Sequence, residues 1–155
     1  MQVFHTLSGE FKEAEIGVLQ AGELTRPLAR RFGFDWEKEV QYDIYKIFLK
    51  EDGVILGLMS LDIVKPEFRI EIRLLESASE NIGKDKIYDR VAGCLIAYAC
   101  KLSFKFGFGG FVSLVPKTEL ISYYQQAYHF SPMGRHLAIE GNEAFELIEK
   151  YLENE

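Results

Sequence analysis

The middle of the chain alternates apolar and polar positions in a way that predicts an antiparallel sheet. Two β-rich runs, DIYKIFLK at residues 43–50, which alternates loosely, and VILGLMSLDIV at 54–64, flank Asp52-Gly53, a residue pair typical of β-hairpins. A third run, FRIEIRLLE at 68–76, alternates cleanly, and Pro66 separates it from the second run. We therefore predict a three-stranded antiparallel meander over about residues 43–76.

A helical period follows these strands. Between Asp85 and Phe106 apolar residues recur at spacings of three and four, which predicts a long helix with Asp85 as its N-cap and Gly107 as its stop. The run FVSLV at 111–115 predicts a short buried strand. This strand should lie parallel to the strand at 68–76, with a right-handed crossover through the helix.

The C-terminal part of the chain predicts two further helices with a strand between them. ELISYYQQAY at 119–128 predicts a short helix, and NEAFELIEKYLENE at 142–155 predicts an amphipathic one. FSPMGRHLAIE at 130–140 predicts a strand or a pair of strands, broken at Pro132 and Gly134.

The order of the predicted elements indicates the fold class. Strands come first and alternate with helices later, which favours an α+β (mixed α/β) protein with a central mixed sheet flanked by helices. No internal repeat or linker-like stretch divides the chain, so residues 1–155 are predicted to form a single domain. The first 42 residues show no pattern that assigns an element.

Composition and charge exclude several classes of protein. With 48% hydrophobic residues the chain can build a core, and its net charge of −6 argues against coating nucleic acid or an anionic membrane. Arg26, Arg30 and Arg31 leave a local nucleic-acid contact open, but surface charge is the favoured interpretation. Two cysteines cannot form a disulfide framework, and no histidine completes a metal set with them. Without a signal-like start or a long apolar run, we expect a cytoplasmic protein that does not enter membranes.

Two stretches of the sequence resemble the GNAT superfamily of acyl-CoA N-acyltransferases. CLIAYACKLSFKFGFGGFVSL at 94–114 is similar to that family's central helix and the strand after it. LISYYQQAYHFSPMG at 120–134 is similar to its short aromatic helix, with Tyr123-Tyr124 at an aromatic pair and His129-Phe130 at a Gly-Phe. The resemblance covers roughly residues 43–152. It implies a GNAT-like fold, acetyl-CoA (coenzyme A) as the cofactor and transfer of the acetyl group to an amine.

The family's pyrophosphate loop, Arg/Gln-x-x-Gly-x-Gly/Ala, is degenerate in this chain. Ile87 stands at the Arg/Gln position and Arg90 at the first glycine, and only Ala92 conforms. A helix N-terminus binds phosphate through backbone N–H groups, so Arg90 either blocks that approach or holds a phosphate itself. The resemblance and the local cations together predict the cofactor contacts Leu74, Leu75, Glu76, Lys84, Lys86, Tyr88, Arg90, Val91, Ala92 and Gly93.

Acyl transfer from a thioester to an amine needs a base for the amine proton and an acid for the departing thiolate. By the resemblance, Tyr124 would be the acid that protonates the coenzyme A sulfur, although the same residue fits a core tyrosine equally well. Glu71 and Glu76, on the strand before the loop, are the candidate bases. Either glutamate also fits a solvated strand position.

The sequence decides neither which amine accepts the acetyl group nor whether the protein is catalytic. The acceptor would be a small-molecule or protein amine, and a homodimer is compatible with the resemblance. The alternative is a non-catalytic GNAT-like scaffold that has lost coenzyme A binding and binds a partner through its surfaces. A third hypothesis, a nucleic-acid-contacting module, would use the segment from Arg26 to Trp36.

Overall fold

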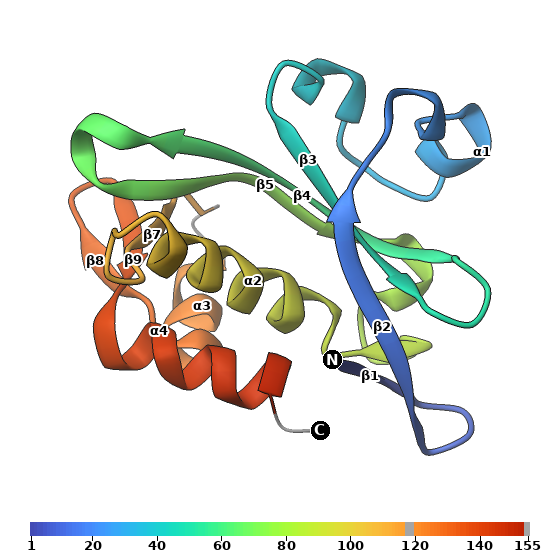
Figure 1. The fold of residues 1–155 in the computed structure, drawn as a ribbon. Helices are drawn as coiled ribbons and strands as arrows, with labels where there is room; N and C mark the ends of the chain where they lie inside the picture. Colours follow the sequence, from blue (N-terminus) through green and yellow to red (C-terminus); the bar gives the residue numbers. More distant parts are fainter. Residues whose placement is uncertain (117–119, 154–155) are drawn as a thin grey trace.

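One mixed sheet forms the centre of the structure, a computed structural model that describes residues 1–116 and 120–153 (Figure 1). Its nine strands lie in the order β6-β1-β2-β3-β4-β5-β7-β9-β8. Within the described residues, β5 and β7 pair in parallel and the other neighbours pair antiparallel. The strands are β1 (Gln2–His5), β2 (Glu10–Val18), β3 (Asp43–Leu49), β4 (Ile55–Val64), β5 (Arg69–Ser77), β6 (Tyr88–Asp89), β7 (Val112–Leu114), β8 (Ser131–Met133) and β9 (His136–Ile139).

The predicted meander is confirmed as β3, β4 and β5. Gly53, in the turn between β3 and β4, has a φ of +77°, which glycine adopts without the strain that a Cβ would bring. The pairing of β4 with β5 contains a bulge, because it skips Arg73 between Ile72 and Leu74. A bulge bends its strand and re-aims the side chains next to it.

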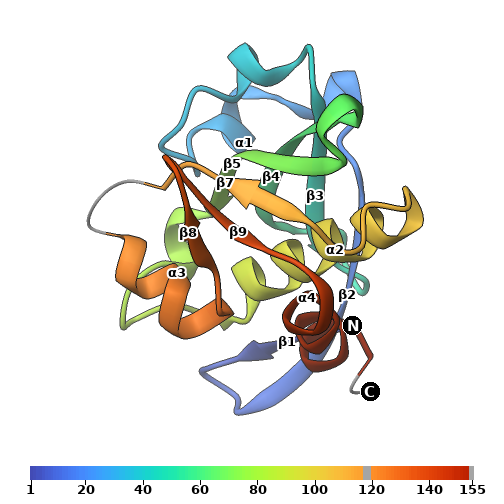
Figure 2. The same ribbon diagram turned by 90° about the vertical axis from the view of Figure 1, so that its left-hand side faces the viewer.

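Helices lie on both faces of the sheet (Figures 1 and 2). The longest is α2 (Val91–Lys105), which packs against β4, β5 and the helix α4. The remaining helical elements are η1 (Ala21–Glu23), α1 (Arg26–Ala29), η2 (Trp36–Glu39), η3 (Lys65–Glu67), η4 (Ser79–Asn81), α3 (Ile121–Tyr128), α4 (Gly141–Ile148) and the π-helical turn η6 (Glu149–Glu153).

Two apolar clusters fill the spaces between these layers. The larger one joins one face of the sheet to α2, α3, α4 and η6, with fully buried members such as Met59 and Leu95. The smaller one lies on the opposite face, where Trp36 of η2 packs against Ile44 and Leu58. Leu58 and Met59 belong to different clusters because neighbouring strand residues point to opposite faces.

The predicted long helix starts later than expected, at Val91 and not at Asp85. Tyr88 and Asp89 form β6 and pair with His5 and Phe4 of β1, and this ladder keeps the segment extended. The predicted end at Gly107 is confirmed. The N–H of Gly107 bonds to the oxygen of Phe104 at 3.0 Å, and that of Phe108 to Ser103 at 2.9 Å, which together make a Schellman cap.

The C-terminal elements follow the prediction with two changes. The predicted pair of strands is confirmed as β8 and β9, but Pro132 lies inside β8, which tolerates it as an edge strand. The short helix at 119–128 is confirmed as α3 from Ile121, and Glu119 lies outside the described residues. The last predicted helix is divided, because α4 ends at Ile148 and η6 continues as a wider turn.

Candidate functional site

The sheet opens between β5 and β7. Their pairing ends with Ile72 opposite Leu114, where β7 stops while β5 continues to Ser77. The bulge at Arg73 lies at this point. Residues 74–77 pair with β4 on one side, and no strand in the described part of the chain pairs with their other side. Such a free edge can hydrogen-bond an extended ligand through its backbone.

A cavity of about 790 Å³ lies at the N-terminal end of α2. Its walls come from Ser77 at the end of β5, the loop at 81–90, the first turn of α2, the helix α3 and the turn η6. The cofactor contacts predicted from the sequence that line it are Lys86, Tyr88, Arg90, Val91 and Ala92. Leu74, Leu75, Glu76, Lys84 and Gly93 are not among its lining residues, whereas the unpredicted Tyr128, Lys150 and Tyr151 are.

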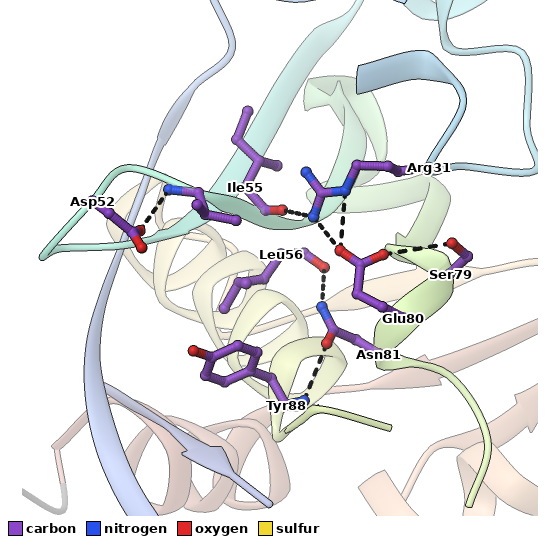
Figure 3. Close-up of polar contacts among 9 residues, drawn as sticks. Arg31, Asp52, Ile55, Leu56, Ser79, Glu80, Asn81 and Tyr88 are labelled. Atoms are coloured by element: carbon purple, nitrogen blue, oxygen red, sulfur yellow. Dashed lines mark hydrogen bonds and ion pairs between the residues drawn. The ribbon is translucent and has the colours of Figure 1, made fainter. Parts of the chain in front are cut away.

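Side chains hold the loop between β5 and α2 in place (Figure 3). Asn81 is buried, donates from Nδ2 to the oxygen of Leu56 at 3.3 Å and accepts the N–H of Tyr88 at 3.1 Å. Glu80 forms an ion pair with Arg31, which also donates to a backbone oxygen of β4. Burial raises the pKa of Glu80, but the hydrogen bonds from Arg31, from the backbone and from Ser79, together with the charge of Arg31, outweigh it and hold that pKa below its usual value. The cavity wall is therefore anchored to the sheet.

The first turn of α2 exposes backbone N–H groups to this cavity. The N–H groups of residues 91–93 have no acceptor within the helix, and they carry the positive end of its dipole. The preceding residue, Arg90, has a φ of +76°, a conformation that favours glycine. By the resemblance, Arg90 stands at the first glycine of the pyrophosphate loop, and glycine adopts a positive φ without the strain that a Cβ brings.

Charged groups surround the start of α2 but largely satisfy one another. Asp89 accepts the N–H of Arg90 at 2.8 Å and the ammonium of Lys86 at 3.2 Å. Burial raises the pKa of Asp89, yet these bonds lower it below its usual value, so the carboxylate stays charged. The Arg90 guanidinium donates to the oxygens of Gln2 at 3.3 Å and Lys150 at 2.9 Å.

Glu76 anchors the N-terminal segment. Its carboxylate accepts the N–H groups of Gly33 and Phe34 and the indole N–H of Trp36, the last at 2.9 Å. With its oxygens engaged in this way, the side chain has little freedom to act as a base. The backbone of Glu76 still lies on the free edge of β5, where the sequence predicted a cofactor contact.

Glu71 lies beside the opening of the sheet and belongs to a polar network that sequence reasoning missed. Its Oε1 is 3.0 Å from Nε2 of His136 on β9 and 2.9 Å from Nη1 of Arg69, which donates to Ser113 on β7 at 2.8 Å. Burial raises the pKa of Glu71, but the hydrogen bonds from Arg69 and His136 outweigh it and keep that pKa low. No local motif links Glu71 to His136, because sheet pairing alone brings them together.

Tyr124 lies in a group of packed tyrosines on α3. Its ring centroid is 5.9 Å from that of Tyr123 and 6.0 Å from that of Tyr128, and burial raises its pKa. Tyr124 does not line the cavity at α2, whereas Tyr123 and Tyr128 do, with their hydroxyls 3.3 Å apart. Burial also raises the pKa of Tyr128, so that it stays protonated at neutral pH.

The arginine cluster of the N-terminal segment is divided by the fold. Arg31 is paired with Glu80, and Trp36 is 2% exposed in the smaller core. Arg26 and Arg30 are exposed. The aromatic and basic side chains therefore do not form one common surface for nucleic acid.

The described residues contain no group of three or more His, Cys, Asp or Glu side chains placed to hold a metal ion. No helix in this part of the chain is long and apolar enough to cross a membrane. Cys94 and Cys100 are free and buried, and burial raises their pKa values to about 11 and about 12.

Comparison with known proteins identifies the fold. No protein-family model and no curated protein matches the sequence, but solved structures match the fold. The IAA acetyltransferase from Bacillus cereus has a TM-score of 0.56 at 14% identity, covering 83% of this chain and 99% of its own. A dodecameric spermidine N-acetyltransferase from Vibrio cholerae has a TM-score of 0.60 at 16% identity, covering 90% and 96%. AtaT, complexed with acetyl-methionyl-tRNAfMet, has a TM-score of 0.59 at 12% identity, covering 88% and 99%. The chain has the mixed, curled sheet and flanking helices of the GNAT N-acetyltransferase fold.

Proposed function

We propose that this protein is an acetyl-CoA-dependent N-acetyltransferase that acts on an amine. The observation that carries the proposal is the cavity at α2, which connects the end of the free β5 edge to the start of a helix. A pantetheine arm is an extended chain with amide groups, and a free strand edge suits it. A pyrophosphate suits a helix N-terminus, so the free β5 edge and the cavity that adjoins its end together offer complementary groups to both parts of coenzyme A.

The cofactor would be held mainly by backbone. In the proposed arrangement, the edge of β5 at Leu74, Leu75 and Glu76 bonds the pantetheine amides. The N–H groups of Val91, Ala92 and Gly93 face the pyrophosphate, with the cations of the surrounding loop nearby. The reacting thioester would then lie at the opening between β5 and β7.

The chemistry follows from what surrounds that opening. The amine nitrogen attacks the thioester carbon, the new C–N bond forms, the C–S bond breaks, and the amine proton leaves. Glu71, held by His136, is the proposed acceptor of that proton, directly or through water. Tyr124 is the proposed acid for the thiolate, and Tyr128 is a second candidate because it lines the cavity.

The acceptor is proposed to be a small-molecule or protein amine of the cytoplasm. Spermidine is the first compound to test, because one of the matching structures is named as a spermidine N-acetyltransferase. That structure is also described as dodecameric, so self-association, a homodimer included, deserves measurement in the same experiments.

Binding and turnover test the proposal separately. Acetyl-CoA at about one hundred times its Kd should raise the melting temperature by about 5–10 °C. Thiol release from acetyl-CoA, followed over a panel of amines, should identify an acceptor. Glu71→Gln should then lower kcat by about a hundredfold without changing cofactor affinity, and Tyr124→Phe and Tyr128→Phe compared side by side identify the acid. No heat in calorimetry and no thermal shift with acetyl-CoA would refute the proposal.

A non-catalytic scaffold is the second candidate, and one observation favours it. Arg90 stands where a glycine would let phosphate come close, and its guanidinium lies across the cavity wall, 4.8 Å from the Tyr151 ring. On this hypothesis the natural chain does not bind coenzyme A and Arg90→Gly restores binding. Calorimetry on the two proteins decides between the hypotheses.

A further inference from the structure

The turn η6 is seated on the first turn of α2. Its Tyr151 is 8% exposed, and the ring lies against Gly93. A Cβ at residue 93 would fall within 2.9 Å of Cδ1 of that ring, and closer still to Cε1 and Cζ. The Tyr151 ring therefore leaves room only for glycine at residue 93. Through Lys150 and Tyr151, η6 also forms part of the wall of the cavity at α2.

Arg90 also holds the backbone of η6, at Lys150, the residue before Tyr151. Its Nη2 donates to the oxygen of Lys150 at 2.9 Å, while the guanidinium carbon lies 4.8 Å from the centre of the Tyr151 ring. The same arginine bonds the oxygen of Gln2, which ties η6 to β1. The main chain of Lys150 is therefore held in place, while its side chain is exposed and lines the cavity.

The three cations that line this cavity differ in their partners. Lys86 pairs with Asp89, and the Arg90 guanidinium is directed to two backbone oxygens. The Lys150 ammonium has no carboxylate partner among the described side chains of residues 1–116 and 120–152, and it lies 5.2 Å from the centre of the Tyr151 ring. Of these three cations, Lys150 is thus the one whose charged group can meet an incoming anion without first breaking an ion pair, as Lys86 must, or hydrogen bonds to the backbone, as Arg90 must.

We propose that Lys150 is a phosphate-binding residue of the cofactor site, supplied by the C-terminal turn and positioned by Arg90. It compensates for the side chains that the degenerate loop lacks. The inference rests on the proposed function, since the phosphates in question are those of coenzyme A. A lysine near a helix N-terminus adds a charge-assisted bond to the backbone N–H groups that already face the ligand.

Calorimetry with coenzyme A tests the inference through matched charge-removing variants. Lys150→Met should weaken binding by about tenfold, the value of one charge-assisted hydrogen bond, and should make the remaining affinity less sensitive to salt. Lys101→Met is the control, because Lys101 is an exposed lysine of α2 that lies about 15 Å along the helix from Val91. It should bind coenzyme A like the natural chain.

The outcomes separate this inference from the proposed function. If the natural chain binds coenzyme A and Lys150→Met binds equally well with the same salt dependence, the assignment of Lys150 is wrong while the proposed function stands. If the natural chain does not bind coenzyme A at all, both are wrong. Circular dichroism of each variant shows whether it is folded, and Arg90→Lys provides a second test, because loss of the bond to the Lys150 carbonyl should weaken binding in the same direction.

Discussion

Replacing Gly93 with alanine should destabilise this protein, although alanine is the better helix former. In an exposed helix the change stabilises by at most about 1 kcal/mol. Here the new methyl group would overlap the Tyr151 ring, which is also packed against Arg90 and Tyr128. Overpacking of this kind costs about 1–3 kcal/mol, so we expect a net loss of about 1–2 kcal/mol.

A double-mutant cycle isolates the contact. Tyr151→Ala alone should cost about 3 kcal/mol, because it removes a nearly buried aromatic ring. In that background Gly93→Ala meets no ring, so it should change from destabilising to neutral or stabilising. The resulting coupling energy between the two positions is about 1–3 kcal/mol, within the range for residues in contact.

Urea denaturation followed by far-UV circular dichroism measures all four proteins of the cycle. The slope of unfolding free energy against urea should stay constant across them, which shows that the midpoint shifts report stability. If Gly93→Ala stabilises the natural chain, or if the coupling energy is near zero, the placement of η6 over α2 is wrong. The cofactor site proposed above would then lose its C-terminal wall.

Three further predictions concern other parts of the molecule. Glu76→Ala removes the acceptor for three N–H donors and should destabilise by about 2–4 kcal/mol, with a red shift in the emission of Trp36, the chain's one tryptophan; unchanged emission and stability would contradict the anchoring role. The pKa of Glu71 in the folded protein lies below its usual value, so the ionised side chain stabilises the fold. This stabilisation is fully present above about pH 4.3, the usual value for glutamate, and is lost as the pH falls through the pKa of the folded protein. Glu71→Gln should therefore weaken the fall of the melting temperature with decreasing pH below about pH 4.3. If the variant and the natural chain show the same fall, the stabilising role of the Glu71 carboxylate is wrong. Cys94 and Cys100 should react with a thiol reagent only after unfolding in urea, because burial keeps them protonated, whereas rapid labelling of the native protein would show that they are accessible.

Elements defined by local pattern were predictable from the sequence. The strands β3, β4 and β5 were found because β-rich composition, the alternation in β3 and β5, and the Asp52-Gly53 turn are local signals that act within a few residues. The end of α2 at Gly107 was found for the same reason, since a helix cap is a local structure. The start of α2 was missed, because pairing with β1, far away in the sequence, decides that the residues before Val91 are extended.

The candidate site shows the same division more sharply. The sequence indicated the loop before α2 and the strand β5 through their order and their resemblance to a family, and the structure places a cavity there. Local spacing could not show that Glu76 anchors the N-terminal segment, that Glu71 meets His136, or that Arg90 meets Lys150. These pairs lie 40, 65 and 60 residues apart along the chain, where periodicity carries no information. Sheet register and the packing of η6 on α2 bring them together, so only the tertiary structure decides which charges remain available to a ligand.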